Sequence, residues 1–235
     1  MSDIYKEKQM LFKSKILQLL TKIKEQEEIR KYELNIFTFD DDGNIKRASV
    51  IPGMNFIKKP GFTNIFITHA SNRFAASTCV CSTYDNFGFI DKTPHLVNQV
   101  RIDFGSKSEL YIDKDFSCGG LDIRLREHHN VYIGEDCMFS SNISIWTSDG
   151  HAIFDKTGNL INIGGDVVIG DHVWVGHGVK FLKKSFVNDG SVVGGSSLVT
   201  KQFNESNIII AGFPAKKIRE EINWTRKPVF AFTDQ

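Results

Sequence analysis

The chain has 235 residues, of which 41% are hydrophobic and 24% are charged, and these values exclude a disordered, collagen-like or coiled-coil protein. The 29 Lys and Arg residues nearly balance the 28 Asp and Glu residues, giving a net charge of +1, so a strongly basic surface for nucleic acid is excluded. No segment has the ~20 consecutive apolar residues of a membrane span, and the N-terminus lacks the features of a secretory leader. We therefore expect a cytoplasmic protein with no transmembrane segment.

The first part of the chain is predicted to be helical. Residues 4–31 carry apolar side chains at helical spacing among Lys, Glu and Gln, namely Ile4, Leu11, Phe12, Ile16, Leu19, Leu20 and Ile23. This stripe must cover either the body of the same subunit or a neighbouring subunit. Residues 34–39 and 45–51 read as two strands around the Asp-rich turn 40–44. The turn lacks the distal Glu of a calcium loop and has Gly43 at the wrong position. We expect residues 1–61 to form this helix and hairpin.

Short apolar runs alternate with turn residues between positions 62 and 125, which predicts an all-β body. The four cysteines form no CxxC pair and are expected to be reduced thiols. Cys79 and Cys81 fall on one face of a strand, and we interpret them as small buried residues.

A repeat of six residues dominates the second half of the chain. Its apolar anchors are Ile133, Phe139, Ile145, Ile163, Ile169, Val175, Phe181, Val187, Val193 and Val199. Gly, Asn or Thr follows most anchors from 163 onward, and Val or Ser stands four positions after them. Short strands joined by tight turns, three to a coil, satisfy this pattern. The anchors are then expected to stack inside the coils.

Three segments carry a resemblance to a known family. They are residues 168–176, 193–201 and 211–216, and they follow Ser148 to His151 and an interruption of the repeat. Residues 109–223 resemble the hexapeptide-repeat acyltransferases, an all-β family whose body is a left-handed parallel β-helix. The residues around His151 and in 118–124 are most similar to the O-acetyltransferases of bacterial capsule and other surface polysaccharides, including those acting on polysialic acid. The resemblance implies a β-helix domain over 62–212, irregular β structure before the regular repeats, a loop insertion at about 148–162, and a short C-terminal helix and tail over 213–235.

The resemblance also implies a function. It predicts an acetyl-CoA-dependent O-acetyltransferase that uses no metal, acts on a hydroxyl of a bacterial surface saccharide and forms a homotrimer with its sites between subunits. His151 is the candidate general base, and Asp149, Asp155 or a backbone carbonyl could orient its second ring nitrogen. Trp174 is expected to lie beside the acceptor and the thioester, where an exposed indole suits a sugar face or a pantetheine arm.

Further residues are assigned to the two substrates through the same resemblance. The acetyl-CoA site is expected to contain His177, Gly195, Ser196, Thr200, Lys201, Lys216 and Arg219. The backbone amide of His177 would hold the oxyanion, and the cationic side chains would meet the phosphates. Galactoside and maltose relatives bind the sugar through an Asn where this sequence has Asp122. That departure, with Arg124 close by, favours an acidic sugar over a neutral one.

Three alternatives remain open at this stage. N-acetylation of an amino sugar would use the same donor geometry and a similar histidine. A metal site like that of the γ-class carbonic anhydrases is suggested by the spacing of His172 and His177, although Asp136 stands where a third His is expected. A non-catalytic β-helical scaffold is the third alternative.

Overall fold

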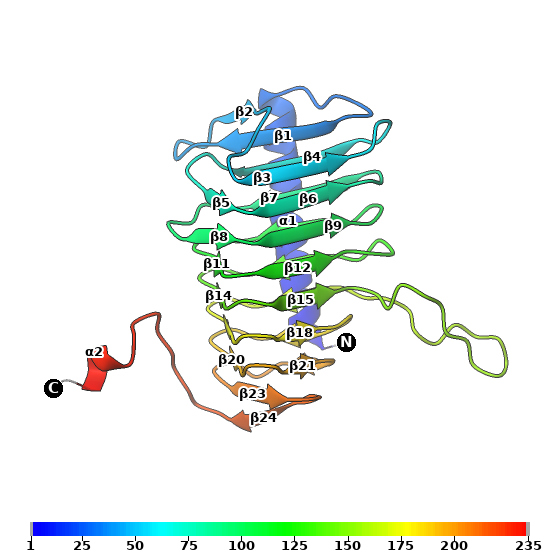
Figure 1. Ribbon diagram of the computed structural model, residues 1–235. Coiled ribbons are helices and arrows are strands. Elements are labelled where there is room, and N and C mark those ends of the chain that lie inside the picture. Colours follow the sequence, from blue (N-terminus) through cyan, green and yellow to red (C-terminus); the bar gives the residue numbers. More distant parts are fainter. Residues whose placement is uncertain (1, 234–235) are drawn as a thin grey trace.

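The computed structural model describes residues 2–233 and places 24 strands in three sheets, the nine-stranded face A, the eight-stranded face C and the seven-stranded face B. The sheets are the three faces of a prism, and each coil of the chain visits them in the order A, C, B (Figure 1). Followed from the N-terminal end, the coils descend with a left-handed sense (Figure 1). The expected left-handed parallel β-helix is therefore confirmed. Antiparallel pairs occur at the two ends of the stack, between β1 and β2 and between β23 and β24.

The strands of each face succeed one another along the stack. Face A contains β2 (Ile45–Arg47), β1 (Leu34–Phe39), β4 (Asn64–His69), β7 (Asn86–Ile90), β10 (Glu109–Ile112), β13 (Val131–Ile133), β16 (Val167–Ile169), β19 (Phe186–Val187) and β22 (Gln202–Phe203). Face C contains β5 (Arg73–Ala75), β8 (Leu96–Asn98), β11 (Ser117–Cys118), β14 (Met138–Phe139), β17 (Trp174–Val175), β20 (Val192–Val193), β23 (Ile209–Gly212) and β24 (Ala215–Arg219). Face B contains β3 (Met54–Lys58), β6 (Ser77–Cys81), β9 (Val100–Phe104), β12 (Leu121–Arg124), β15 (Ile143–Trp146), β18 (Lys180–Phe181) and β21 (Leu198–Val199).

The core runs along the axis of the prism. All the predicted anchors except Ile163 are buried there, as are the small residues four positions after the anchors from 169 onward. Cys79 and Cys81 are buried free thiols in the same core, as predicted. Ile163 is 55% exposed, so its prediction as an anchor is wrong. It lies in the inserted segment before β16, where the chain has not yet rejoined the stack.

The coils begin earlier than the sequence pattern indicated. β1 pairs in parallel with β4, and β3 pairs in parallel with β6, so the stack starts at residue 34 and the division at residue 61 lies inside it. The predicted hairpin at 34–51 is present as β1 and β2. Its turn is closed by Asp40, whose carboxylate accepts a hydrogen bond from the amide of Asn44 at 2.9 Å.

The C-terminal segment contains the expected short helix and, before it, a strand that the sequence did not predict. Residues 215–219 form β24, which pairs with β23, and the helix α2 (Phe230–Thr233) is only four residues long. Between them the chain returns along the corner of the prism between faces A and C. None of the helices in residues 2–233 is long and apolar enough to cross a membrane.

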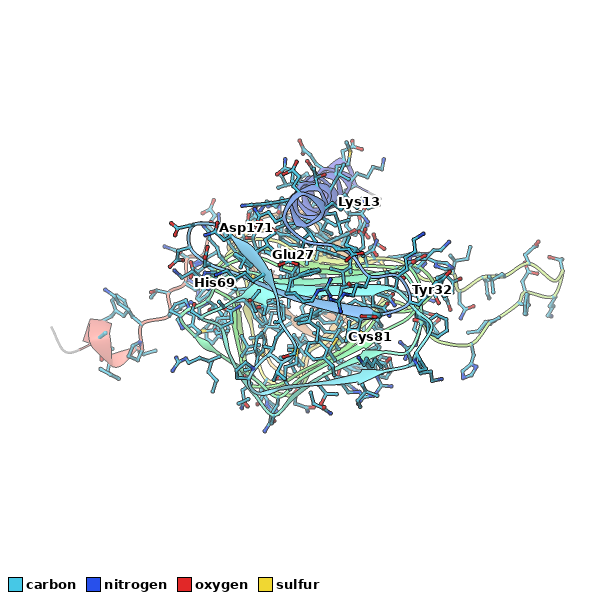
Figure 2. All side chains as sticks on the ribbon, turned by 90° about the horizontal axis from the view of Figure 1, so that it is seen from above. Lys13, Glu27, Tyr32, His69, Cys81 and Asp171 are labelled. Carbon is cyan, nitrogen blue, oxygen red and sulfur yellow. The ribbon has the colours of Figure 1, made fainter. Side chains whose placement is uncertain are left out.

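The helix α1 (Asp3–Gln26) lies against the outside of face A (Figures 1 and 2). Its N-cap is Ser2, whose hydroxyl accepts a hydrogen bond from the amide of Tyr5. The helix buries Tyr5, Phe12, Ile16 and Ile23 against an outer layer of face A that contains Phe37, Ile67, Phe87, Phe89, Tyr111, Tyr132, Val168 and Phe186. The predicted stripe thus covers the body of its own chain. Ile4 and Leu11 do not take part and are at least 40% exposed.

The helix spans the whole height of face A. At one end the amide of Ser2 donates to the side chain of Gln202 on β22 at 2.9 Å, and at the other end Gln26 accepts from the amide of Ile45 on β2 at 2.6 Å. A 24-residue helix is ~36 Å long, and the eight strand spacings between β2 and β22 add up to ~38 Å. The two lengths agree, so each turn of the helix has a strand beneath it.

Lysines on α1 form ion pairs with the corner between faces A and C. Lys8 lies 3.0 Å from Asp171 and 2.8 Å from Asp189, and Lys15 lies 2.5 Å from Asp113. Burial acts to lower the pKa of Lys8, but its hydrogen bonds to Asp189 and Asp171 outweigh this and raise the pKa above its usual value. Lys8 and Lys15 are seven residues apart, a distance of ~10.5 Å along the helix. Their partners Asp171 and Asp113 follow β16 and β10, which are two strand spacings or ~9.6 Å apart on face A. The two distances agree, so each lysine lies at the height of its aspartate.

Candidate functional site

An inserted loop, residues 147–166, leaves the prism between β15 and β16 at the corner between faces B and A. It projects far from the body on the side away from the C-terminal segment (Figures 1 and 2). Residues 149–161 are all exposed, and an isolated bridge joins Phe154 to Leu160. The predicted insertion and its histidine, His151, are thus on an arm that presents them to the outside.

The base of this loop is held by a small polar clamp. The ammonium group of Lys183 lies 2.5 Å from the carboxylate of Asp149 and donates to the carbonyl of Asn162 at 2.7 Å. The side-chain amide of Asn162 donates to Asp149 at 2.9 Å and to the carbonyl of His151 at 2.8 Å. The hydrogen bond from Lys183 lowers the pKa of Asp149 most, so its carboxylate stays charged. The clamp fixes the backbone at His151 and leaves the imidazole exposed.

Neither candidate carboxylate is bound to the His151 ring. Asp149 belongs to the clamp, and Asp155 accepts hydrogen bonds from Thr157 and Asn159 within its own turn. Those bonds, led by the one from the Thr157 side chain, lower the pKa of Asp155 to about 2. Within residues 2–233 the His151 ring makes no hydrogen bond to another protein group. An acceptor for its second ring nitrogen is therefore not provided by these two aspartates.

The loop rejoins the stack through two glycines in a crowded place. A Cβ on Gly164 would lie 2.5 Å from the ring of His129, and one on Gly165 would lie 2.2 Å from the side chain of Lys184. A larger residue at either position would require the side chain of His129 or of Lys184 to move. The two glycines thereby allow the loop to close directly onto β16.

Trp174 is on face C, and its side chain is 40% exposed. Its strand lies between β14 and β20, where Met138 and Val192 are the paired residues. The loop with His151 leaves from the corner opposite face C. A single chain therefore does not bring His151 and Trp174 together.

Three predicted residues do meet, at the corner between faces C and B. The amide of Ser196 donates to the carbonyl of His177 at 2.7 Å, and a Cβ on Gly195 would lie 3.3 Å from that carbonyl. The Nδ1 atom of His177 lies 3.0 Å from the hydroxyl of Ser141. In the described part of the chain the His177 amide donates to no protein acceptor, which leaves it available to a ligand.

Asp122 and Arg124 lie side by side on the outer surface of face B. The guanidinium of Arg124 donates to Asp122 at 2.9 Å and lies 4.8 Å from the ring centre of Trp146 on the next strand. Arg101, on the strand before, lies 3.8 Å from the other Asp122 oxygen. Face B thus offers a planar aromatic surface, 38% exposed at Trp146, beside two cationic groups.

A groove of about 450 Å³ continues from this surface at the corner between faces B and A. Tyr84, Arg126, Glu127 and His128 are among its lining residues. Glu127 accepts a hydrogen bond from Ser148 at the start of the inserted loop, at 2.5 Å. The groove therefore borders the base of the loop that carries His151.

The remaining predicted residues lie at the C-terminal end of the stack but on different faces. Thr200 and Lys201 follow β21 at the corner between faces B and A, and the ammonium of Lys201 lies over the ring of Phe203. Lys216 and Arg219 are exposed on β24, the edge strand of face C. These four side chains are not gathered at one point of a single chain.

Sequence reasoning missed Trp146 and the clamp. Trp146 directly follows the anchor Ile145, a position that points outward in a β-helix strand, so this signal was present in the repeat. Lys183 and Asn162 are twenty-one residues apart and carry no motif. Only the fold brings them to the base of the loop.

Known proteins are similar to this chain in sequence and in fold. The chain is 44% identical over 98 residues to a polysialic acid O-acetyltransferase of Escherichia coli O1:K1, covering 41% of this chain and 32% of that protein. It is 39% identical over 123 residues to the polysialic acid O-acetyltransferase of Neisseria meningitidis, covering 52% of this chain and 57% of that protein. The crystal structure of the polysialic-acid-specific acetyltransferase NeuO superposes with a TM-score of 0.51 and 25% identity, covering 83% of this chain and 89% of that one. The chain is similar to the hexapeptide-repeat O-acetyltransferases. No protein-family model matches the sequence.

The sequence similarity covers only part of the length of these curated relatives. The matched stretch spans about a third and just over half of the length of these two curated relatives. The structural match to NeuO extends over most of both chains. The likeness therefore includes the early coils, which the sequence pattern had not revealed.

The two histidines of the metal-site alternative, His172 and His177, do not lie together in the structure. Both ring nitrogens of His172 have protein partners, because Nδ1 lies 2.6 Å from Asp136 and Nε2 lies 3.1 Å from the carbonyl of Trp224. His177 is at another corner of the prism. Within residues 2–233 no three His, Cys, Asp or Glu side chains are grouped as metal ligands.

Proposed function

We propose that this protein transfers an acetyl group from acetyl-CoA to a hydroxyl of an acidic bacterial surface saccharide. The observation that carries the proposal is the inserted loop, which presents His151 on a clamped backbone in a chain similar to polysialic acid O-acetyltransferases. An exposed imidazole held in this way can meet a hydroxyl without rearrangement of its support. An imidazole can both take up and return a proton in such a step.

The proposed reaction needs no covalent enzyme intermediate. The His151 imidazole takes the proton of the acceptor hydroxyl while its oxygen attacks the thioester carbonyl. The amide of His177, which has no protein acceptor within residues 2–233, donates to the negative oxygen of the tetrahedral intermediate. The intermediate collapses by breaking the C–S bond. The leaving CoA sulfur takes the proton from His151, so the enzyme returns to its starting state.

The acceptor is proposed to bind along face B. The Trp146 indole would stack on the face of a sugar ring, and Arg124 and Arg101 would meet its carboxylate. The hydrogen bond to Asp122 holds the guanidinium of Arg124 in place, and Arg101 lies 3.8 Å from the same carboxylate. The groove beside the loop would hold a neighbouring part of the acceptor.

Assembly of copies is proposed to complete the site. Face A is covered by α1, whereas faces B and C are open. In a homotrimer, face B of one subunit would face face C of the next, as in closed cyclic assemblies with head-to-tail interfaces. His151 of one copy and Trp174 of another would then border one cleft. The donor residues of the C-terminal coils would lie along the same cleft.

This shared cleft predicts complementation between inactive variants. His151→Ala and Trp174→Ala subunits are each expected to be inactive or severely impaired alone. The two variants are unfolded and refolded together as a 1:1 mixture. Each site takes His151 from one subunit and Trp174 from its neighbour, and each of these subunits carries the intact residue in about half of the cases. About a quarter of the sites would therefore have both residues intact. The measurement is the initial rate of acetyl transfer, with sedimentation velocity to check assembly. No recovery of activity in mixed assemblies would contradict a site shared between subunits.

The proposed reaction can be tested by a transfer screen. Purified protein and acetyl-CoA would be incubated with acidic polysaccharides, neutral polysaccharides and amino sugars, and products read by mass. Acetylation of hydroxyls on acidic glycans is expected. Preference for neutral glycans would refute the acidic acceptor, acetylation of amines would favour N-acetylation, and no transfer with any acceptor would leave a scaffold role.

A further inference from the structure

The last part of the chain forms a strap along the corner between faces A and C. After β24 the amide of Ile222 donates to the carbonyl of Asn207 at 3.0 Å, and the chain then passes back toward earlier coils. We call residues 222–226 the strap. Beyond it, Val229, Phe230 and Phe232 are at least 58% exposed, so the strap is the part of this segment that is tied to the body.

Arg226 anchors the strap through four hydrogen bonds. Its guanidinium donates to Asp136 at 2.8 Å and to the hydroxyl of Ser117 at 2.7 Å. It also donates to the carbonyls of Asp115 and Cys137 at 2.9 and 3.0 Å. These partners come from two successive coils, at the turns that precede β11 and β14 and at the first residue of β11. A planar fork with several donors makes such a contact, which a lysine could not reproduce.

Trp224 lies against the turn that leads into β17. Its ring stacks on His172, with centres 4.0 Å apart and planes 11° apart, and its Nε1–H donates to the His172 carbonyl at 2.9 Å. The His172 ring lies between the carboxylate of Asp136 and the carbonyl of Trp224.

The same indole also borders Trp174. The two ring centres are 6.1 Å apart at an angle of 44°, within the range of favourable aromatic pairs. Trp224 is 8% exposed, whereas Trp174 is 40% exposed. One indole is thus buried between His172 and Trp174, and the other presents its free surface outward.

We propose that Trp224 is a positioning residue that holds Trp174 in the orientation required for acceptor binding. The inference rests on the proposed function, because it assigns Trp174 to the acetyl-transfer cleft. On face C, Trp174 lies between its paired residues Met138 and Val192, and Trp224 adds a contact from the corner between faces A and C. The strap packs Trp224 against one side of the indole, and the hydrogen bonds of Arg226 tie the strap to the body.

The test compares variants of the full chain in acetyl transfer. Trp224→Ala is expected to raise the KM for the acceptor about tenfold, in line with the loss of one well-packed aromatic partner. The kcat and the KM for acetyl-CoA should stay within about twofold. Trp224→Phe should restore most of the acceptor affinity. Arg226→Lys should shift the acceptor KM in the same direction by a smaller factor, and Phe230→Ala, beyond the strap, should leave all three parameters unchanged.

A second readout does not depend on catalysis. The chain has three tryptophans, so 5-fluorotryptophan labelling gives few fluorine resonances, which Trp146→Phe and Trp174→Phe variants assign. The Trp174 resonance should be a single sharp line in the wild type and in Trp224→Phe, and should broaden or split in Trp224→Ala and Arg226→Lys. An unchanged Trp174 resonance, or equal changes in kcat and both KM values, would overturn the inference. Absence of transfer by the wild type would instead refute the proposed function, and the resonances would still decide the role of the strap.

Discussion

Replacement of His151 by alanine is expected to lower the rate of acetyl transfer by a factor of about 10² to 10⁴, the usual contribution of a general base. The side chain is exposed on the inserted loop, and its ring makes no hydrogen bond to protein within residues 2–233. The clamp holds the backbone of His151 through its carbonyl and not through the ring. The substitution should therefore remove the base without disturbing the loop.

The measurement is the initial rate of CoA release with saturating acceptor, together with thermal unfolding and equilibrium binding of CoA. Lys156→Ala provides a matched control, because Lys156 is exposed in the same loop and has no assigned role. It should keep the wild-type rate. Unfolding temperature and CoA affinity should be unchanged in both variants, and retained turnover in His151→Ala would refute the assignment of His151 as the base.

Replacement of Phe12 by alanine is expected to lower the free energy of unfolding by about 3–5 kcal/mol. Phe12 is 1% exposed between α1 and face A. Its ring stacks on Tyr132, with centres 5.4 Å apart and planes 4° apart, and also lies 5.4 Å from the ring of Tyr111. Because alanine favours the helix, the loss would come from packing and the cavity left behind.

Urea unfolding followed by circular dichroism would measure this loss. Leu17→Ala is the control, since Leu17 is on the same helix but 66% exposed, and it should change the free energy of unfolding by less than about 0.5 kcal/mol. Equal effects of the two substitutions would mean that α1 does not pack on its own chain in solution.

The regular part of the fold could be predicted because its coils are 18 residues long. Val168 pairs with Phe186 eighteen residues later, so three faces of six residues keep their anchors in one register. In the earlier coils Ile65 pairs with Phe87 and Leu110 pairs with Val131, twenty-two and twenty-one residues apart. The extra residues at the corners remove the period of six from the sequence, although the stacking is the same. This is why the early coils read only as short strands.

Less of the site than of the fold could be predicted from the sequence. A catalytic histidine and an outward tryptophan could be named from the resemblance, but their positions on different corners follow from which face each strand joins. Trp146 and Arg124 become neighbours only through the pairing of β12 with β15. Trp224 and His172 are fifty-two residues apart in the chain. Such contacts depend on the exact length of each coil, which the six-residue pattern does not specify outside its regular region.

The equal lengths of α1 and face A limit how this architecture can change in evolution. Loss or gain of a single coil changes the height of the stack by ~4.8 Å. Loss or gain of three helix residues would match this length, but it would rotate the apolar side of the helix by about 60° away from the sheet. Two coils and seven helix residues, by contrast, preserve both length and direction to within about 20°. Proteins that keep this helix should therefore differ by even numbers of coils. An odd difference would require a helix that ends short of the stack or is lost altogether.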